Sequence, residues 1–431
     1  MKTRGRYLHF KTTKMARTFS LSIILIFSLH LQAQTSLTLE QCEAKFVKNN
    51  FSLLSAQYNI DAAKALTIQA KLWENPVISS ELNAINPTNN KSFDIGKNGQ
   101  KAIAIQQLIY MGGKKQKQIE IARLNEQLAI LEFQDLLRNL KFQLRQTFYN
   151  IYFNQERIAT AGYQINNLDS LVNSYASQSK KGNVPIKDYV RLQALLVDLN
   201  NQKMELLKNN TEQLSKMSVL LGDSTSLIPS VPKEFLNKYI QTLNLNVFDL
   251  EQIATQERPD IKINEEQVQG NILNVGLQKA MRVPDLNLGT AWDQHGGAFN
   301  NQVNLTLGVA LPIWNRNKGN IKNAEVLVSQ SKLDRQAAQF SLNAEVQMAY
   351  KNWLDVQHNY KSLSNVNSDN YDSVYIGIVE NFRKGNINIL DFTDFIESYN
   401  QLKLHINELK QNVVMTSEVI ITVVNKDVFK N

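Results

Sequence analysis

The feature that most constrains the fold is a long stretch without proline, which runs from Gly113 to Lys180. Its apolar residues recur at alternating steps of three and four, the period of one helix face; they are Phe133, Leu137, Leu140, Leu144, Phe148 and Ile151. An unbroken helix of about 68 residues is ~100 Å long at 1.5 Å per residue, which is too long for a compact globular domain. The sustained period therefore predicts a helix that packs along neighbouring helices as in a coiled coil.

A second long segment has the same period, with an apolar stripe formed by Leu333, Ala337, Phe340, Ala344 and Met348. Each long segment leads into a similar short motif, KKGNVPIKDY at residues 180–189 and RKGNINILDF at residues 383–392. The glycines of these motifs, Gly182 and Gly385, tolerate a positive φ, which ends a helix and lets the chain reverse. Another helix is expected after each turn.

The order of segments is written twice along the chain. Each half reads helix, strand, loop, strand, long helix, turn and helix, and LEQ near its start recurs at residues 39–41 and 250–252. A repeated order predicts two copies of one unit. We assign the first repeat to residues 34–221, a linker or equatorial segment to residues 222–248, the second repeat to residues 249–425 and a C-terminal tail to residues 426–431.

Residues 1–33 predict a cleaved secretory signal. Basic residues precede an apolar segment at residues 19–31, and the small residue Ala33 follows it. A membrane anchor is the alternative, although the apolar segment is shorter than the ~20 residues that span a bilayer as a helix. A lipoprotein is disfavoured because Cys42 lies well past the apolar segment. Met1 and Met15 are both candidate starts.

The charge and the cysteine count exclude several classes of protein. Removal of the signal takes away six basic and no acidic residues, which lowers the formal net charge from +8 to +2. The basic character thus belongs mostly to the signal and gives no reason to expect a nucleic-acid partner. A single cysteine forms no internal disulfide, so burial or oligomerisation must stabilise the chain.

The sequence has no constellation that indicates an enzyme. It contains no phosphate-binding loop, no GxSxG nucleophile elbow and no HExxH zinc motif. Outside the signal the histidines are His295, His358 and His405, and no two lie at metal-ligand spacing. We therefore expect no catalytic residue, no cofactor and no metal site.

Four shorter segments, two in each half, alternate in the manner of strands. In one of them Val303, Leu305 and Leu307 point to one side, while Asn304 and Thr306 point to the other. Each segment has about 9–11 residues, the length of a tilted transmembrane strand. A soluble hairpin with one buried face is the alternative.

Aromatic residues flank these strands. Trp73, Tyr110 and Trp314 lie at the helix-proximal ends of their strands and Trp292 lies at a far end, as expected at the two membrane interfaces. Four strands cannot close a barrel around water, and an open sheet edge cannot face lipid. Several chains must therefore contribute strands to one barrel.

This order of segments and the repeated turn resemble the TolC family of outer-membrane efflux channels over nearly all of the chain after the signal. The resemblance implies a mixed α and β membrane protein: a long α-helical coiled-coil barrel in the periplasm plus four transmembrane β-strands per chain, completed by a homotrimer as a 12-stranded β-barrel in the outer membrane. Implied partners are a periplasmic adaptor and an inner-membrane pump of the RND type. YMGGKK at residues 110–115 and LPIWNRNKGNI at residues 311–321 are most similar to the CzcC-type channels of heavy-metal efflux.

The resemblance also implies where the tunnel narrows. Asp188 and Asp391 lie six residues after the turn glycines, and Asp394 lies one helical turn beyond Asp391. Matching positions in related channels line the closed periplasmic end, where symmetry makes rings of carboxylates that favour cations. The alternative is an ordinary helix start, where Asp interacts well with the helix dipole.

Two departures from the family pattern bear on the gate. Drug-efflux members use a tyrosine three residues before the second turn glycine and an arginine two residues after it, where this chain has Phe382 and Ile387. Any contact that holds the tunnel shut must therefore involve other pairs of residues. We hypothesise that Arg191 and Asp394, which occupy corresponding positions of the two repeats, pair to hold the tunnel shut.

The turns themselves are expected to dock the adaptor through their exposed basic residues. This docking set is Lys180, Lys181, Gly182, Asn183, Arg383, Lys384, Gly385 and Asn386. The sequence thus indicates a passive export channel for heavy-metal cations or small toxic compounds. The alternatives are the outer-membrane duct of a type I protein-secretion system and a periplasmic coiled-coil scaffold without a barrel.

Overall fold

The computed structural model describes residues 35–224, 227–241, 243–296, 298–364 and 368–429. The predicted signal at residues 1–33 lies outside them. The chain divides into two compact units. Unit 1 consists of the residues up to Asn49 together with Thr147–Pro232, and unit 2 consists of Asn50–Gln146 together with the residues from Lys233 onward.

Unit 1 is a helical unit with a short parallel sheet. It contains α2 (Leu39–Asn49), the second part of α4 (Lys114–Lys180) and α5 (Ile186–Leu221). Strand β1 (Thr35–Leu37) pairs in parallel with β6 (Leu227–Pro229). At the end of α5, Gly222 adopts φ +59° where a Cβ would approach the Asn49 carbonyl oxygen to 2.6 Å, so this close approach requires glycine.

Unit 2 contains the first part of α4 and most of the other helices. They are α3 (Phe51–Lys71), the 3-10 helix η1 (Phe235–Lys238), α6 (Val247–Glu257), α7 (Pro259–Ala280), α8 (Lys318–Ser364), α9 (Ser368–Arg383) and α10 (Ile389–Val424). Helix α4 has 67 residues, which confirms the helix predicted from Gly113 to Lys180. In the second half the corresponding stretch is described as α8 and α9, with residues 365–367 left undescribed between them.

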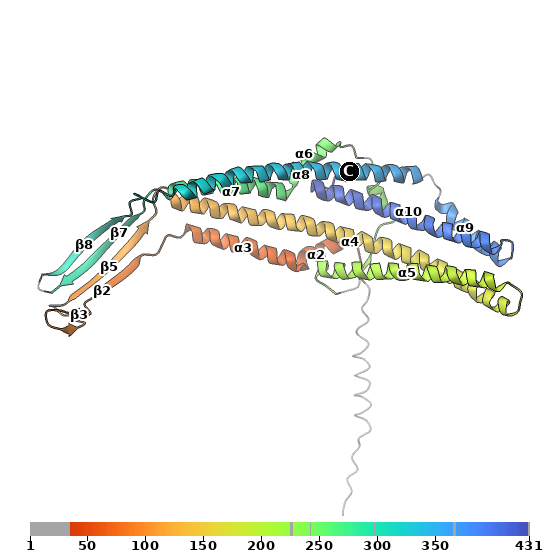
Figure 1. Cartoon of the computed structure of the whole chain (residues 1–431), viewed down its shortest axis with the longest axis horizontal. Helices are drawn as coiled ribbons and strands as arrows, with labels where there is room; N and C mark the ends of the chain where they lie inside the picture. The colour runs from red at the N-terminus through yellow and green to blue at the C-terminus, as the bar shows by residue number, and fades with distance from the viewer. Residues whose placement is uncertain (1–34, 225–226, 242, 297, 365–367, 430–431) are drawn as a thin grey trace, which may run out of the picture. The chain divides into compact units, whose positions relative to one another are not determined.

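A four-stranded antiparallel sheet completes unit 2. Its strands are β2 (Val77–Leu82), β5 (Gln100–Ile109), β7 (Leu286–His295) and β8 (Phe299–Val309), in the order β2-β5-β7-β8 (Figure 1). The central β5–β7 pair therefore joins the two halves of the chain. In the sequence, a small hairpin of β3 (Ile85–Asn86) and β4 (Lys91–Ser92) follows β2 and precedes β5.

The four predicted strands are confirmed, but one predicted length is wrong. Strand β2 has 6 residues instead of the expected 9–11. Pro76, which lacks an N–H group, precedes the strand, and after Leu82 the chain turns toward the β3–β4 hairpin.

The register of the sheet separates an apolar face from a small and polar face. Trp292, Thr290, Leu288 and Leu286 of β7 lie opposite Val303, Leu305, Leu307 and Val309 of β8. The alternate residues on the other face include Asn287, Gly289, Ala291, Asn304 and Thr306. In one chain the apolar face is uncovered, since Leu305 is 89% exposed. A row of this kind indicates a surface that some apolar medium or partner must cover.

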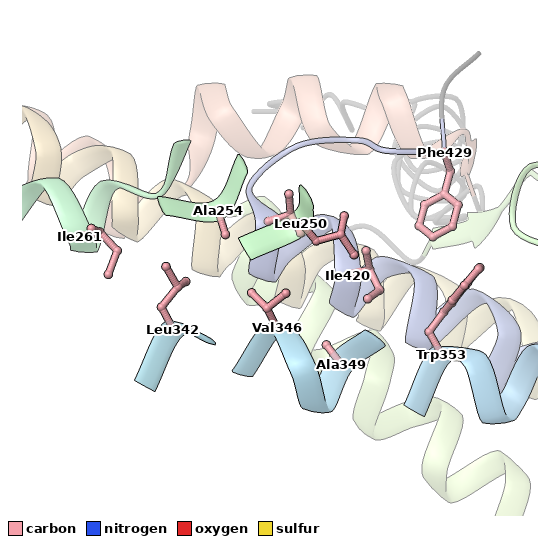
Figure 2. Close-up of a cluster of buried hydrophobic side chains, with 10 residues drawn as sticks. Leu250, Ala254, Ile261, Leu342, Val346, Ala349, Trp353, Ile420 and Phe429 are labelled. Atoms are coloured by element: carbon pink, nitrogen blue, oxygen red, sulfur yellow. The ribbon is translucent and has the colours of Figure 1, made fainter. Parts of the chain in front are cut away.

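A hydrophobic core of unit 2 lies where α6, α7, α8 and α10 meet. Figure 2 shows its side chains, which are Leu250, Ala254, Ile261, Leu342, Val346, Ala349, Trp353, Ile420, Val424 and Phe429. The Trp353 and Phe429 rings lie 5.9 Å apart, so Phe429 is held against α8. Burial of this apolar set ties helices from distant parts of the chain together.

The expected apolar stripe of α8 is present but lies on the exposed side of the helix. Phe340 is 78% exposed, and Leu333 and Met348 are exposed as well. The core is instead contacted by Leu342, Val346 and Trp353, which follow the same period on another face. Helix α8 thus carries two apolar stripes, and the predicted one lies exposed in a single chain, so its packing along neighbouring helices stays a prediction. The stripe of α4 is buried or half-buried, as predicted.

A buried ion pair crosses the core between α4 and α10. The Glu418 side chain is 0% exposed, and its Oε2 accepts a hydrogen bond from Arg145 Nη1 at 3.0 Å. The Tyr239 hydroxyl donates to the other carboxylate oxygen at 2.7 Å. The backbone oxygen of Tyr239 in turn accepts from Gln357 Nε2 at 2.6 Å. Both carboxylate oxygens are therefore satisfied, as a buried charge requires.

A second cationic group is anchored at the start of α7. Arg258 donates to Asp260 through Nε at 3.0 Å and through Nη2 at 2.6 Å, and it also pairs with Glu345. Burial alone would raise the pKa of Asp260, but the hydrogen bonds and charge of Arg258 lower it below its usual value. The bidentate pair with Asp260 orients the guanidinium, and the pair with Glu345 links the start of α7 to α8.

We expect Glu418→Ala to lower the free energy of unfolding by about 3–5 kcal/mol, because it removes the buried carboxylate that pairs with Arg145 and accepts from Tyr239. Thermal unfolding of the detergent-solubilised protein, followed by far-UV circular dichroism, measures this change. Glu397→Ala on the exposed face of the same helix is the matched control, with an expected change within about 0.5 kcal/mol. Equal melting temperatures for the two variants would contradict a stabilising role of the pair.

Candidate functional site

The first candidate site is the turn between α4 and α5, which we call the first tip. Gly182 adopts φ +78°, the left-handed conformation that the sequence predicted. The Asn183 N–H donates to the Gln178 carbonyl at 3.0 Å and the Gly182 N–H donates to the Ser179 carbonyl at 3.0 Å. This bond pattern is a Schellman motif, which satisfies the last carbonyl groups of α4.

The turn between α9 and α10, the second tip, repeats this geometry. Gly385 has φ +76°, and the Asn386 N–H donates to the Asn381 carbonyl at 2.9 Å. The Gly385 N–H donates to the Phe382 carbonyl at 3.0 Å. The two Gly-Asn motifs therefore build the same helix end.

The asparagines of the tips have a role that our sequence reasoning missed. Asn183 Nδ2 donates to Gln178 Oε1 at 2.6 Å, and Asn386 Nδ2 donates to Asn381 Oδ1 at 3.1 Å. Each hydrogen bond links the turn to the last residues of the preceding helix. The signal was present in the sequence, since an amide side chain precedes the asparagine by five residues in both motifs.

The four basic residues of the tips point to solvent. Lys180, Lys181, Arg383 and Lys384 are all exposed, and within the described part of the chain none of them takes part in an ion pair. The tips thus present positive charge on a rigid turn. Docking of a partner there stays a prediction.

The helices after the two tips start differently. At the second tip, Asn388 caps α10: its Oδ1 accepts from the Asp391 N–H at 3.0 Å, and its Nδ2 donates to Asp391 Oδ2 at 2.6 Å. At the first tip, Pro185 occupies the cap position of α5 and offers no side-chain bond. Asp391 is thus held by its own helix cap, whereas Asp188 has no such cap to bind.

Asp188 lies near an aromatic residue of the preceding helix. It is half-buried, and burial together with the Asp188 charge raises the pKa of the Tyr175 hydroxyl. Asp188 therefore contributes negative potential on the inner side of the first hairpin.

The remaining constriction candidates differ in exposure. Asp394 and Arg191 are exposed, and they belong to unit 2 and unit 1 respectively, so their pairing stays a prediction. Phe382 is buried, and its ring stacks on the Phe392 ring with 4.0 Å between centroids and 12° between planes. Its hydroxyl-free ring therefore packs inside the second hairpin, and a place for it at the constriction also stays a prediction.

Further aromatic contacts hold the second hairpin closed. The Tyr375 and Tyr399 rings stack with centroids 4.5 Å apart. The Tyr399 hydroxyl donates to Asp372 Oδ1 at 2.6 Å, and Lys403 Nζ donates to the same oxygen at 2.9 Å. Although burial opposes it, hydrogen bonding by Tyr399 and Lys403 lowers the pKa of Asp372. This ladder joins α9 to α10 over several turns.

The strand-to-helix junction forms a second candidate region, at the YMGGKK motif. Lys114 Nζ pairs with Asp285 Oδ1 at 2.7 Å, and the same oxygen accepts from the Met111 N–H at 3.0 Å. Gly112 has φ +67°, and a Cβ there would approach Val283 Cβ to 2.7 Å. The motif thus joins the end of β5 to the segment before β7 and requires glycine at position 112.

The matching motif of the second half begins α8. Asn317 adopts φ +55°, and its Nδ2 donates to the Gln278 carbonyl at 2.8 Å. Asn320 Nδ2 donates to Asn317 Oδ1 at 2.7 Å. The residues between β8 and α8 also border a recess of about 720 Å³ beside Lys114 and Asp285. Both family-like motifs therefore serve the geometry of the junction.

The predicted interface aromatics lie at the two ends of the sheet. Trp73 precedes β2, Tyr110 directly follows β5 and Trp314 follows β8, while Trp292 lies toward the far end of β7. Lys115 Nζ lies 5.8 Å from the Trp73 ring centroid. Their placement along the strands agrees with the prediction, and contact with a membrane interface stays a prediction.

Two kinds of feature are absent from the residues that the structure describes. No group of three or more His, Cys, Asp or Glu side chains is arranged to hold a metal ion there. None of the helices described is both long and apolar enough to span a membrane.

Comparison with known proteins gave consistent matches. Residues 250–425 match the family model described as outer membrane efflux protein. The chain is 22% identical over 370 residues to the cobalt-zinc-cadmium resistance protein CzcC of Cupriavidus metallidurans, and the match covers 84% of each chain.

Solved structures share the fold. The chain resembles CusC with a TM-score of 0.74 at 15% identity, covering 92% of this chain and 95% of that one. It resembles the CmeC outer membrane channel of Campylobacter jejuni with a TM-score of 0.71 at 16% identity, covering 90% and 86%.

We expect Gly182→Ala and Gly385→Ala each to destabilise their tip by roughly 1–2 kcal/mol, because a Cβ is strained at positive φ even where space is free. Amide hydrogen exchange at the tip and at the last turn of the preceding helix measures the effect. Gly377→Ala is the matched control: it also has free space but lies inside α9, where alanine stabilises by about 0.5–1 kcal/mol. Protection that is unchanged in both tip variants would contradict the role of the glycines.

Proposed function

We propose that this chain belongs to the outer membrane efflux protein family and serves as the outer-membrane channel of a tripartite efflux system. The match of residues 250–425 and the shared fold over nine-tenths of the chain support this function. The family consists of passive channels, so the chain is not an enzyme. It conducts substrates across the outer membrane, and partner proteins supply the energy.

The observation that carries the proposal is the exposed apolar face of the four-stranded sheet. Leu305, Leu307 and Val303 of β8 form an uncovered row, and residues between them are small or polar. This alternation suits strands with one side toward lipid and the other toward a wet lumen. A periplasmic scaffold without a barrel would have no use for such a face.

A homotrimer completes the barrel. Strands β2 and β8 form the edges of the sheet in one chain, and an edge in lipid needs a partner strand. The exposed stripe of α8, with Leu333, Phe340 and Met348, supplies a matching apolar surface between helices of neighbouring chains. Three copies give a 12-stranded barrel with a helical tunnel in the periplasm.

The cargo we propose is a heavy-metal cation or a small toxic compound. The relative from Cupriavidus metallidurans is named for cobalt, zinc and cadmium resistance, and this supports a cation cargo. In the trimer, Asp188, Asp391 and Asp394 form rings of carboxylates at the periplasmic end, which favour cations over anions. The described residues offer a conduit for such ions rather than a storage site.

The gate rests on an ion pair between Arg191 and Asp394. Both side chains are exposed within one chain and thus accessible to a neighbouring helix. Opposite charges at a symmetric constriction close it at a small cost in stability, because exposed pairs are worth about 0–1 kcal/mol each.

We expect Asp394→Ala and Arg191→Ala each to raise the single-channel conductance of the purified protein in planar bilayers, because either change removes the pair. The exchanged variant, with Arg191→Asp and Asp394→Arg together, should restore the low conductance of the wild type. Asp198→Ala, an exposed carboxylate of α5 that bonds within its own helix, is the control and should leave conductance unchanged. Unchanged conductance in both single variants would rule out the lock.

The tips dock a periplasmic adaptor, which links the channel to an inner-membrane pump of the RND type. The exposed cations Lys181 and Lys384 and the stapled turns behind them support a rigid docking element. Acidic or amide side chains on an adaptor hairpin are the complementary groups.

A photo-crosslinking amino acid at position 181 or 384 is expected to capture the adaptor in intact cell envelopes, because both positions project from the tips. The crosslinked partner is identified by mass spectrometry. Position 208, which is exposed on the middle of α5, is the control and should capture much less. Absence of any adaptor from both tip positions would refute this assignment.

A further inference from the structure

The loop between β2 and β5, residues 83–99, exposes large apolar side chains; we call it the surface loop. Ile85 is 64% exposed, Phe93 is 68% exposed and Ile95 is 51% exposed. The loop joins two strands at the end of the sheet that lies away from the helices (Figure 1). A loop that served only to connect strands would have polar residues at such positions.

The exposure does not come from a loosely held backbone. Strands β3 and β4 pair within the loop, and the Phe93 N–H donates to the Ala84 carbonyl at 3.0 Å. Asn86 is buried, and its Oδ1 accepts from the Thr88 N–H at 2.9 Å. The loop therefore has a defined conformation of its own.

The surface loop is also fastened to β7 and the turn after it. Gln294 Nε2 donates to the Gly96 carbonyl at 3.0 Å, and the Gly296 N–H donates to the Gly99 carbonyl at 3.1 Å. A Cβ on Gly296 would lie 1.9 Å from the backbone of Asn98, so the two segments are in close contact. These contacts fix the position of the surface loop relative to the sheet.

Phe93 occupies a costly backbone conformation. Its φ is +49°, a region that bulky residues seldom adopt. A strained residue that is also exposed gains nothing from packing within the chain. Backbone strain of this kind is common at functional sites. We therefore expect the Phe93 ring to contact something outside the chain.

Basic side chains accompany the apolar ones. Lys91 and Lys97 are exposed on the surface loop, and Lys101 follows at the start of β5 with its Nζ 5.8 Å from the Trp292 ring centroid. The single carboxylate of the loop, Asp94, accepts hydrogen bonds at Oδ2 from Asn86 and Asn89, both at 2.9 Å. The loop therefore presents net positive charge beside its apolar side chains.

We propose that the surface loop is a lipid-binding element that rests on the outer leaflet of the outer membrane. Ile85, Phe93 and Ile95 insert at the boundary between headgroups and acyl chains, and Lys91 and Lys97 bind the phosphates of anionic glycolipid. The combination of exposed apolar residues and cations fits an anionic lipid surface. The orientation of the loop rests on the proposed function, which places this end of the sheet outside the cell.

Nitroxide labels on Ile95→Cys and Phe93→Cys test the insertion in full-length protein reconstituted into vesicles that contain lipopolysaccharide. Both labels should be more accessible to oxygen than to a water-soluble nickel chelate, as expected in the acyl region. Thr88→Cys, exposed on the same loop but polar, is the matched control and should show the opposite preference. The native Cys42 is buried and contributes little label.

Retention of lipopolysaccharide tests the lysines. Protein purified with Lys91→Gln and Lys97→Gln together should retain about tenfold less lipopolysaccharide after detergent exchange than the wild type, since each lysine near an anionic membrane surface strengthens binding several-fold. Lys187→Gln with Lys208→Gln, two exposed lysines of α5, should match the wild type. Equal retention in both double variants would overturn the proposal.

The outcomes separate this proposal from the proposed function. Wild-type protein that leaves the cell envelope without detergent would refute the membrane channel itself. Protein that inserts while both loop labels prefer the nickel chelate would refute only the lipid-binding loop. Labels shielded from both reagents would mean a contact with another protein chain, which would also overturn it.

Discussion

Hydrogen bonding at the edges of the four-stranded sheet is the constraint on which the rest of the structure depends. In the proposed channel the sheet lies in a bilayer, where no water is available to an unpaired peptide group, so the edges formed by β2 and β8 would need strands from other copies. Once copies are joined there, the helices that continue from the strands must also run beside one another. The second apolar stripe of α8, exposed in a single chain, would then pack against a neighbouring copy. Within one chain, the ion pair of Lys114 with Asp285 links the sheet to the helices.

The sequence predicted what depends on local patterns. The end of α4 at Lys180, the positive φ of Gly182 and Gly385 and the alternation of β8 all followed from period, spacing and residue type. The face on which α8 packs did not follow, because Phe340 and Val346 obey the same period and only the tertiary structure decides between them. The bond between Arg145 and Glu418 joins residues far apart in the chain, so no local pattern signals it. The proposed constriction could be predicted only by resemblance, because a ring of side chains would require several copies.

The two tips share one motif but differ in the contacts around it. Both use Gly-Asn to end a helix, and both staple the turn with an asparagine side chain. The second hairpin adds stacked rings, Phe382 on Phe392 and Tyr375 on Tyr399, which the first hairpin does not share because Ser179 and Val172 stand at the positions that match Phe382 and Tyr375. Stacked aromatic pairs contribute about 0.5–1.5 kcal/mol beyond the area they bury. These contacts therefore stiffen the second hairpin.

The carboxylates near the two tips also differ in their surroundings. Asp391 accepts a hydrogen bond from the Asn388 amide that caps its own helix, so part of its charge is used to stabilise the helix start. Asp188 follows a proline cap that donates nothing, and Asp394 lies exposed one turn further along its helix. Three rings that look equivalent in sequence would thus differ in the field they present to a passing ion. In the proposed trimer, Arg191 stands where the first repeat would carry the counterpart of Asp394, so it is the residue that we expect to neutralise that carboxylate.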